Sequence, residues 1–407
     1  MKVTEIGTKV KQKIRLVADH LKSNLTCPKY KFVLEMLAGI ISTGGLNLER
    51  ISISLKESIS CRHTHKRLCR QVQQNGELMQ LINDYILHTT SSNIRDTTCI
   101  YLDGGDITYA SATSYEYMSK VKDGSTGGIK DGYVSNLVVC KDNQGRVFPV
   151  CYNIYHRHTG YESDNKETLK IIDLFLSANG NNGVWVLDRG YDSGYIIDKL
   201  LSNNCNFIIR MVGTRHLVYK NEKVIVNDLA KNNPLKYHYK YGEYHYKKCY
   251  YKGHEVTMIY YKKKNVDMKL LVSGHIQRKK EIELCLERYF QRWCVEDGHR
   301  FIKQAFMLEK SRASKFESIK CLAGLAILAW YVLYKIANDE ALKYELLEQS
   351  KTTKPKKVSF DYYRIIRGIQ EVFKLLTEMF RFRTYKHKET QVSIEYFLRK
   401  YDRFVYL

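Results

Sequence analysis

The sequence predicts an α/β fold around a mixed β-sheet, with a helical region before it and further helices after it. Three patterns indicate this fold class. Apolar residues recur at helical spacing between positions 31 and 88. From Thr98 to about 212, strand patterns alternate with helix patterns, which is typical of a sheet with parallel and antiparallel neighbours. Residues 213–268 then change to a period-two alternation rich in tyrosine and lysine.

The same patterns divide the 407-residue chain into five regions. Residues 1–95 are predicted to be helical, and residues 96–212 to form the first part of the sheet core. Residues 213–268 are expected to be an all-β insertion. Residues 269–340 complete the core, and residues 341–407 form a basic C-terminal helical region.

The charge of the chain is strongly positive, because lysine and arginine total 66 against 43 acidic residues, a formal net charge of +23. Such a surplus is typical of proteins that bind a polyanion, most often nucleic acid. An anionic membrane is the alternative, but the apolar run Leu322–Tyr334 is too short to span a bilayer and is typical of a buried helix. The first residues lack the apolar core of a signal peptide, so we expect a cytosolic protein without a membrane partner.

The cysteines are scattered singly and form no CxxC pair, which argues against a disulfide framework and against a zinc ribbon. Cys61, His63, His65 and Cys69 are close in sequence, but no second ligand cluster has metal-site spacing. A zinc site there is the less favoured reading.

The N-terminal region contains a pattern for a short helix, a turn and a second helix that begins near Ser60 (LNLERISISLKESISCRHTHKRLCRQV, residues 46–72). A helix-turn-helix uses such a second helix in the major groove or along the phosphates of DNA. A solvated basic helix without a ligand is the alternative. The side chains expected to contact DNA are Arg62, Lys66, Arg67 and Arg70.

The core pattern begins with a strand that we expect to end at Asp103, followed by a hairpin over residues 135–155 with its turn at 142–145. A helix over 166–178 and a strand that ends at Asp188 come next. A helix over 193–204 and a strand over 205–213 precede the insertion. Residues 269–274 resume the core, and a long helix around Glu296 follows.

Three carboxylates stand out by their positions at strand ends or on that helix: Asp103, Asp188 and Glu296. Such groups can converge at one edge of a sheet, where ligands usually bind. Three like charges would repel one another unless a cation neutralised them, and hard divalent ions prefer carboxylate oxygens. Two such ions can activate a water or a 3′-hydroxyl in a phosphoryl displacement. On a basic protein, this predicts DNA cleavage or strand transfer.

Each carboxylate also has a structural explanation. Asp103 could form a turn in LDGGD, where Asp106 competes for the same role, and Asp188 could cap the following helix. Glu296 could pair with Arg292 and Arg300 on a solvated helix face. The order strand–Asp, strand–Asp, helix–Glu is less expected than any one of these features alone.

The stretch RYFQRWCVEDGHRFIK (288–303) adds a second pattern. If it forms one helix at ~100° per residue, four side chains fall within an arc of roughly 60°. An aromatic ring, a guanidinium, a carboxylate and an ammonium would then share one stripe. These residues are Tyr289, Arg292, Glu296 and Lys303.

The three acids in this order, with a β-rich insertion before the glutamate helix, resemble bacterial DDE transposases with a ribonuclease H-like catalytic core. Residues 289–303 match the Tyr-x2-Arg-x3-Glu-x6-Lys signature of the insertion-sequence-four family, and LDRGYDS and YLDGGDI resemble its second and first Asp motifs. The resemblance covers about residues 30–340. The family often has Thr or Ser after the first Gly, so the LDGGD sequence leaves both Asp103 and Asp106 open as the first ligand.

The resemblance implies a metal-dependent DNA endonuclease and strand transferase that performs cut-and-paste transposition of an insertion sequence, with a hairpin intermediate implied by the signature alone. Asp103, Asp188 and Glu296 would be catalytic and would bind Mg²⁺, with two ions per site and Mn²⁺ able to substitute. The partners would be double-stranded DNA (terminal inverted repeats and target) and a second copy in a homodimeric synaptic complex, in the bacterial cytosol at the nucleoid. The residues that would contact DNA phosphates are Tyr289, Arg292, Lys303 and Arg189.

Two other functions remain open at this stage. A tyrosine recombinase would use a His-x-x-Arg pair such as His275 and Arg278, but it needs no acidic triad. A transposase-derived DNA-binding protein without catalytic activity would keep the acids as relics.

Overall fold

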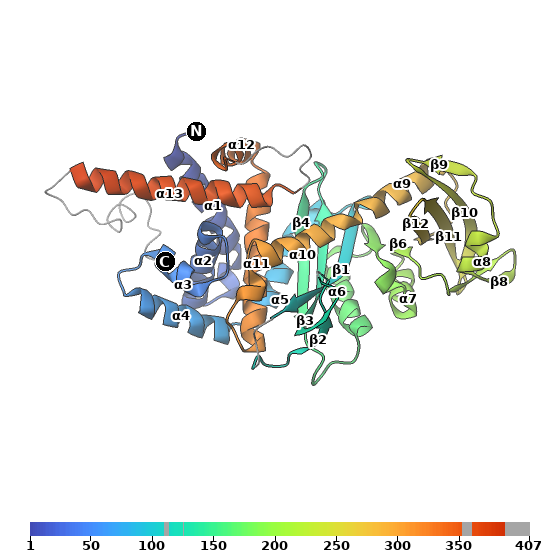
Figure 1. Cartoon of the computed structure of the whole chain (residues 1–407), viewed down its shortest axis with the longest axis horizontal. Helices are drawn as coiled ribbons and strands as arrows, with labels where there is room; N and C mark the ends of the chain where they lie inside the picture. The colour runs from blue at the N-terminus through green and yellow to red at the C-terminus, as the bar shows by residue number, and fades with distance from the viewer. Residues whose placement is uncertain (110–113, 125, 352–359, 387–407) are drawn as a thin grey trace.

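The computed structural model of the chain describes residues 1–109, 114–124, 126–351 and 360–386. The molecule is elongated (Figure 1). N- and C-terminal helices form one end, a large sheet with helices on both faces lies in the middle, and a β-rich lobe forms the other end.

The helical end is built around α11 (Phe316–Ala337), which is buried along nearly its whole length. This helix is long and apolar enough to cross a membrane, but 89% of its most apolar window is buried inside the structure, as in the core helix of a folded protein. It packs against helices from both termini of the chain. The other helices of this end are α1 (Val3–Leu21), α2 (Cys27–Thr43), α3 (Leu48–Leu55), α4 (Cys61–Gln74), α5 (Leu78–Thr90), α12 (Glu340–Gln349) and α13 (Tyr362–Lys386).

The predicted short helix, turn and second helix of the N-terminal region agree with α3 and α4. Helix α4 begins one residue after Ser60, whose hydroxyl accepts the backbone N–H of His63 and caps the helix. On its buried side, Thr64, Leu68 and Val72 pack toward the bundle. Arg62, Lys66 and Arg70 of α4 are exposed to solvent.

The middle of the molecule is the predicted mixed sheet. In the described part of the chain the strand order is β2-β3-β1-β5-β6-β12-β11-β10-β7-β8, with β4 beside β3 and β9 beside β10. Only β1–β5 and β5–β6 pair in parallel. The strands are β1 (Cys99–Thr108), β2 (Ser119–Lys122), β3 (Ile129–Lys141), β4 (Val147–Tyr155), β5 (Val184–Leu187), β6 (Asn206–Arg210), β7 (His216–Tyr219), β8 (Glu222–Ile225), β9 (Tyr237–Tyr239), β10 (Gly242–Tyr251), β11 (His254–Lys263) and β12 (Val266–Ser273).

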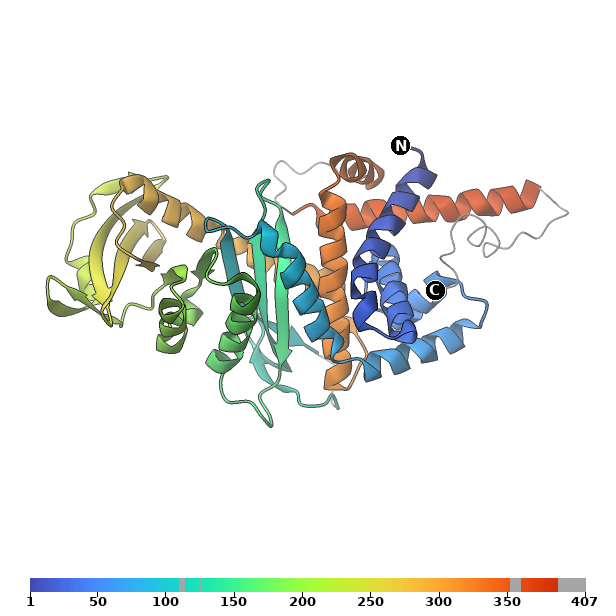
Figure 2. The same cartoon turned by 180° about the vertical axis from the view of Figure 1, so that it is seen from behind.

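Helices cover the two faces of the core strands. Helices α5, α6 (Asp164–Asn179) and α7 (Gly194–Ser202) lie on the face seen in Figure 2. Helices α9 (Lys279–Phe290) and α10 (Cys294–Gln304) cross the opposite face, toward the viewer in Figure 1. The chain passes through the β-rich lobe after β6 and reaches α9 only afterwards. The lobe is therefore inserted between the core strand β6 and the helices that cross the core strands.

Three expectations from the sequence differ from the structure. Strand β1 continues past Asp103 to Thr108, because its antiparallel pairing with β3 extends to the end of the strand. The insertion contains one helix, α8 (Val226–Lys231), whose apolar residues at spacings of three and four are buried. The helix around Glu296 is interrupted by the 3₁₀ turn Gln291–Trp293, so the 289–303 stretch is not one continuous helix.

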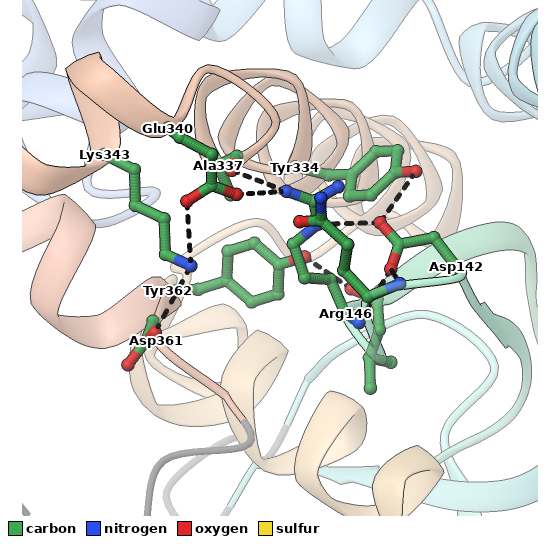
Figure 3. Close-up of polar contacts among 10 residues, drawn as sticks. Asp142, Arg146, Tyr334, Ala337, Glu340, Lys343, Asp361 and Tyr362 are labelled. Atoms are coloured by element: carbon green, nitrogen blue, oxygen red, sulfur yellow. Dashed lines mark hydrogen bonds and ion pairs between the residues drawn. The ribbon is translucent and has the colours of Figure 1, made fainter.

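A polar cluster joins the C-terminal helices to the tip of the β3–β4 hairpin (Figure 3). Arg146 donates to the Asp142 carboxylate at 2.7 Å, to the carbonyl of Ala337 at the end of α11 at 3.0 Å, and to Glu340 of α12 at 2.9 Å. The hydroxyl of Tyr362, at the start of α13, donates to the carbonyl of Val147. These contacts connect the β3–β4 hairpin to three consecutive helices much later in the sequence, α11, α12 and α13.

Candidate active site

The first two acids lie side by side because of the parallel pairing of β1 and β5. That pairing ends at Leu102 and Leu187, and Asp103 and Asp188 are the next residues of each chain segment. Both therefore lie at the carboxyl edge of the parallel strands, which is where ligands bind in sheets of this type. Asp103 is not the last residue of its strand, but it is the first beyond the parallel neighbour.

The third acid reaches the same point from the helix side. The guanidinium of Arg292, in the 3₁₀ turn between α9 and α10, lies 2.9 Å from Asp103 Oδ2, 3.0 Å from Glu296 Oε1 and 3.7 Å from Asp188 Oδ2. Arg292 is only 8% exposed. The three carboxylates predicted to converge therefore surround one buried guanidinium.

The electrostatics of the acids follow from this arrangement. Burial is the largest cause that raises the pKa of Asp103, and the neighbouring charges of Asp188 and Glu296 also raise it. The charge of Arg292 opposes this rise, and the resulting pKa is about 6. Burial also tends to raise the pKa of Asp188, but Arg292, a backbone N–H and the Tyr289 hydroxyl outweigh it and lower the pKa. Burial tends to lower the pKa of Arg292, but the surrounding carboxylates raise it well above its usual value.

Tyr289 and Arg189 lie beside the second acid. The Tyr289 hydroxyl donates to Asp188 Oδ1 at 2.8 Å, so it orients that carboxylate. Arg189 follows Asp188 directly and is exposed. Arg210 of β6 lies 4.0 Å from Asp188 and adds a second cation on that side.

Lys303 does not join the Arg292 cluster. Its ammonium lies 2.7 Å from Asp106 Oδ2 and 3.3 Å from Glu309 Oε1. Asp106, the alternative to Asp103 in the LDGGD sequence, also accepts the backbone N–H of Gly124. The two aspartates of β1 therefore belong to two adjacent ionic clusters, and Asp103 is the one in contact with Arg292.

His299 supports the site, although no motif in the sequence indicated this role. Its Nε2 lies 3.2 Å from the carbonyl oxygen of Asp103, and burial lowers its pKa to about 4, so the ring is neutral at pH 7. The ring packs so closely on Gly105 that a Cβ there would lie 2.5 Å from Nδ1. Gly105 thus allows α10 to approach the strand.

An open cavity of about 660 Å³ gives access to this region. Carboxylates and cations of both clusters line it, among them Asp103, Glu296, Asp106 and Lys303. Lys310, at the end of the loop that follows α10, contributes to its rim. A nucleic-acid strand could reach the acids from this side.

The three acids suit a hard divalent cation, since such ions prefer carboxylate oxygens. The three negative charges also exceed the single positive charge of the guanidinium among them. Within the described ranges, no three histidine, cysteine or acidic side chains are arranged as a ready metal site. The reason is visible in the contacts, because the Arg292 guanidinium occupies the space among the oxygens. A metal would require this guanidinium to move.

The N-terminal basic residues fall into two groups. Arg62, Lys66 and Arg70 are exposed and make no ion pair with any carboxylate that the structure describes. Arg67 instead lies 2.6 Å from Glu35 and 2.8 Å from Glu57, partly buried against the bundle. A contact of Arg67 with DNA, which stays a prediction, would compete with these two ion pairs.

Comparisons with known proteins agree with the region identified above. The family described as "Transposase DDE domain" matches residues 94–332, which is more than half of the chain and includes all three acids and Arg292. No curated protein matches the chain. Among solved structures, a cryo-EM structure of the piggyBac transposase synaptic complex with hairpin DNA is similar over 98% of this chain and 83% of that chain, with 12% identity and a TM-score of 0.46.

Proposed function

This chain belongs to the transposase DDE domain family, and from that premise we propose that it moves a DNA element by cut-and-paste transposition. The proposed substrate is double-stranded DNA, first the terminal inverted repeats of the element and then the target. The observation that carries the proposal is the convergence of Asp103, Asp188 and Glu296 on one buried guanidinium.

In the proposed mechanism, Asp103, Asp188 and Glu296 hold two divalent cations, Mg²⁺ or Mn²⁺. When bound, these ions would activate the attacking water or 3′-hydroxyl and stabilise the leaving oxygen. Tyr289 keeps the Asp188 carboxylate oriented through its hydroxyl. His299 holds the backbone of Asp103 at the face of α10.

The signature of the insertion-sequence-four family supports DNA contacts for Tyr289, Arg292, Lys303 and Arg189. We propose that a DNA phosphate replaces the carboxylates as the partner of Arg292, because a guanidinium binds both groups in the same bidentate way. Lys303, between Asp106 and Glu309, would supply a point charge to a neighbouring phosphate. We further propose a homodimer in the synaptic complex, with a hairpin intermediate at the element ends, in the bacterial cytosol.

Two adjacent acids on α10 offer a matched test. Glu296 contacts Arg292, whereas Asp297 pairs with the exposed Arg300 at 3.1 Å. We expect Glu296→Gln to abolish Mg²⁺-dependent nicking of DNA that carries the element ends, and Asp297→Asn to retain it. Binding of the same DNA in EDTA should remain nearly unchanged in both variants.

The outcomes separate the proposed function from its alternatives. Nicking by Glu296→Gln at the rate of the unmodified protein would end the assignment of Glu296. Binding without nicking by the unmodified protein, in both Mg²⁺ and Mn²⁺, would favour a non-catalytic DNA-binding protein. A covalent phosphotyrosine adduct that forms in EDTA would favour a tyrosine recombinase.

A further inference from the structure

A basic surface lies between the N-terminal helices and the active-site cavity. One part of it is residues 310–315 (KSRASK), which connect the 3₁₀ turn Leu308–Lys310 to α11; we call this segment the basic loop. The other part is the row Arg62, Lys66 and Arg70 on α4, which we call the cation stripe. Helix α4 packs against α11, so the two lie on neighbouring elements (Figure 1).

A cavity of about 330 Å³ lies between α4 and the basic loop. Its lining comes from the start of α3, from the His65 and Cys69 side of α4, and from the basic loop. Glu49 is the carboxylate in this lining. Lys310 lines both this cavity and the active-site cavity, so the two lie on either side of one side chain.

The basic loop is held rigidly by its neighbours. The Tyr115 hydroxyl donates to the carbonyl of Ser311 at 3.1 Å, and the backbone N–H of Glu116 donates to the carbonyl of Ser314 at 2.8 Å. The Glu116 carboxylate in turn accepts the N–H of Phe316 at 3.0 Å. Because these bonds fix the backbone, the side chains between them project from a preorganised support.

The cations of the loop point outward from this support. Lys310, Arg312 and Lys315 are exposed, while Ser311 between them is buried. None of the three forms an ion pair with a carboxylate in the described part of the chain, and the same holds for the cation stripe. Six cations that have no ion pair with a described carboxylate therefore lie on α4 and the basic loop, and Lys310 among them also lines the active-site cavity.

The spacing of the cation stripe suits a regular polyanion. Residues four apart on a helix lie on one face, and eight residues at 1.5 Å each cover ~12 Å. Phosphates on one strand of duplex DNA recur about every 3.4 Å along the helix axis, so the stripe covers about three or four of them. A strand that passes this stripe and the basic loop would arrive at the cavity that Asp103 and Glu296 line.

We propose that the basic loop and the cation stripe form one binding track for the phosphate backbone of duplex DNA that leads into the active site. This inference rests on the proposed transposase function, and it assigns contacts to Lys310, Arg312 and Lys315 beyond the signature residues. These residues bind DNA and take no part in the chemical step. The contacts are to phosphates and are independent of DNA sequence.

The salt dependence of DNA binding tests the track directly. A duplex of ~30 base pairs and arbitrary sequence is sufficient, because phosphate contacts carry no sequence information. Binding is measured in EDTA by fluorescence anisotropy over a series of salt concentrations. For the triple variant Lys310→Ala, Arg312→Ala, Lys315→Ala, we expect the slope of log Kobs against log salt to become shallower by about 2.7, which is ~0.9 for each lost contact.

Two further variants serve as controls. Lys166→Ala, Lys170→Ala, Lys199→Ala removes the same charge from α6 and α7, on the other face of the sheet (Figure 2), and should leave the slope nearly unchanged. Lys310→Arg, Arg312→Lys, Lys315→Arg keeps the charge of the loop and should retain the slope. This second variant also separates lost contacts from any effect of the alanines on folding.

The proposal is overturned if the loop variant and the α6–α7 variant give the same slope and affinity. It is also overturned if the charge-retaining variant loses as much slope as the alanine variant. Failure of the proposed function has a different signature, namely duplex binding by the unmodified protein without nicking in Mg²⁺. The slope comparison can still be made in that case.

Discussion

Arg292 determines how three acidic side chains can share one site without a bound cation. Its guanidinium contacts Asp103 and Glu296 at hydrogen-bond distance and lies 3.7 Å from Asp188. Without a positive charge at this point, the carboxylates would repel one another in a partly buried environment. Arg292 therefore holds the place in which a divalent cation is expected to bind.

If Arg292 and a divalent cation compete for the same carboxylates, Arg292→Ala should respond to metal more strongly than the unmodified protein. In EDTA the variant should be less stable than the unmodified protein by about 3 kcal/mol, because removal of one partner leaves buried charges unpaired. Millimolar Mg²⁺ or Mn²⁺ should raise the melting temperature of the variant more than that of the unmodified protein, since the ion then binds without displacing a guanidinium. Differential scanning fluorimetry without DNA measures both effects.

Arg300→Ala is the matched control for this experiment. Arg300 is also on α10, but it is exposed and pairs only with Asp297 among the described carboxylates. Its removal should change neither the stability in EDTA nor the metal response by a comparable amount. Equal metal-induced shifts in Arg292→Ala and the unmodified protein would contradict competition between the guanidinium and the ion.

Single residues also mark the limit of prediction from sequence at this site. The spacing of Tyr289, Arg292 and Glu296 predicted a shared stripe, and these residues do meet around Asp188 and Asp103. Lys303 was expected beside them, but its partners are Asp106 on β1 and Glu309 after α10. Spacing along one helix could not reveal this, because the partners come from elements that only the fold brings together.

At the scale of elements, apolar runs bounded by turn residues were the most predictable features. The hairpin over 135–155 matches β3 and β4, with its turn at Asp142–Gly145, because two apolar runs flank a polar tetrapeptide. The end of β1 was less predictable, since pairing with β3, and not local sequence, sets its length. Helix α8 was missed because it is a single short apolar repeat inside a tyrosine-rich alternation.

The β-rich lobe is attached to α9 by an acidic side chain. Glu287 accepts hydrogen bonds from Lys240 and from the Tyr239 hydroxyl of the lobe. These bonds from Lys240 and Tyr239 lower the pKa of Glu287 to about 2. The lobe therefore depends on an ionised Glu287 for part of its connection to α9.

The lowered pKa gives this connection a defined pH dependence. A depressed carboxyl pKa stabilises the folded state fully above the unfolded value of about 4.3, and this stabilisation is lost as pH falls toward 2. We expect Glu287→Gln to be less stable than the unmodified protein at pH 7, with a smaller difference at pH 3. Urea unfolding followed by circular dichroism at the two pH values measures this.

Glu243→Gln is the control for the lobe, because Glu243 is exposed and pairs only with His238 among the described residues. It should show little difference at either pH. If Glu287→Gln lowers the unfolding free energy equally at pH 7 and pH 3, the charge of Glu287 does not stabilise the contact between the lobe and α9. In that case the loss would come from packing and not from charge.

At the scale of the whole molecule, helices from both ends of the chain enclose α11, and the polar cluster of Figure 3 joins the C-terminal helices to the sheet. The sequence predicted helices at both ends and a buried α11, because apolar periodicity is local. It could not predict that Arg146 would donate to the carbonyl of Ala337 at the end of α11, since this contact spans 191 positions along the chain. The same limit applies to the joining of α13 to β4 through Tyr362.

Arg146→Ala tests whether this cluster makes the C-terminal helices part of the catalytic core. The change leaves Asp142 and the Ala337 carbonyl without their guanidinium donor, which should cost about 2 kcal/mol of unfolding free energy. Arg157→Ala is the control, since Arg157 is more exposed and its pair with Asp164 should contribute ~1 kcal/mol or less. Urea unfolding gives the free energies, and limited trypsin digestion should release a fragment beyond α11 earlier from Arg146→Ala than from Arg157→Ala. If both variants have the same unfolding free energy and the same rate of trypsin cleavage, the polar cluster does not stabilise the C-terminal helices. Apolar packing on α11 would then hold these helices in place.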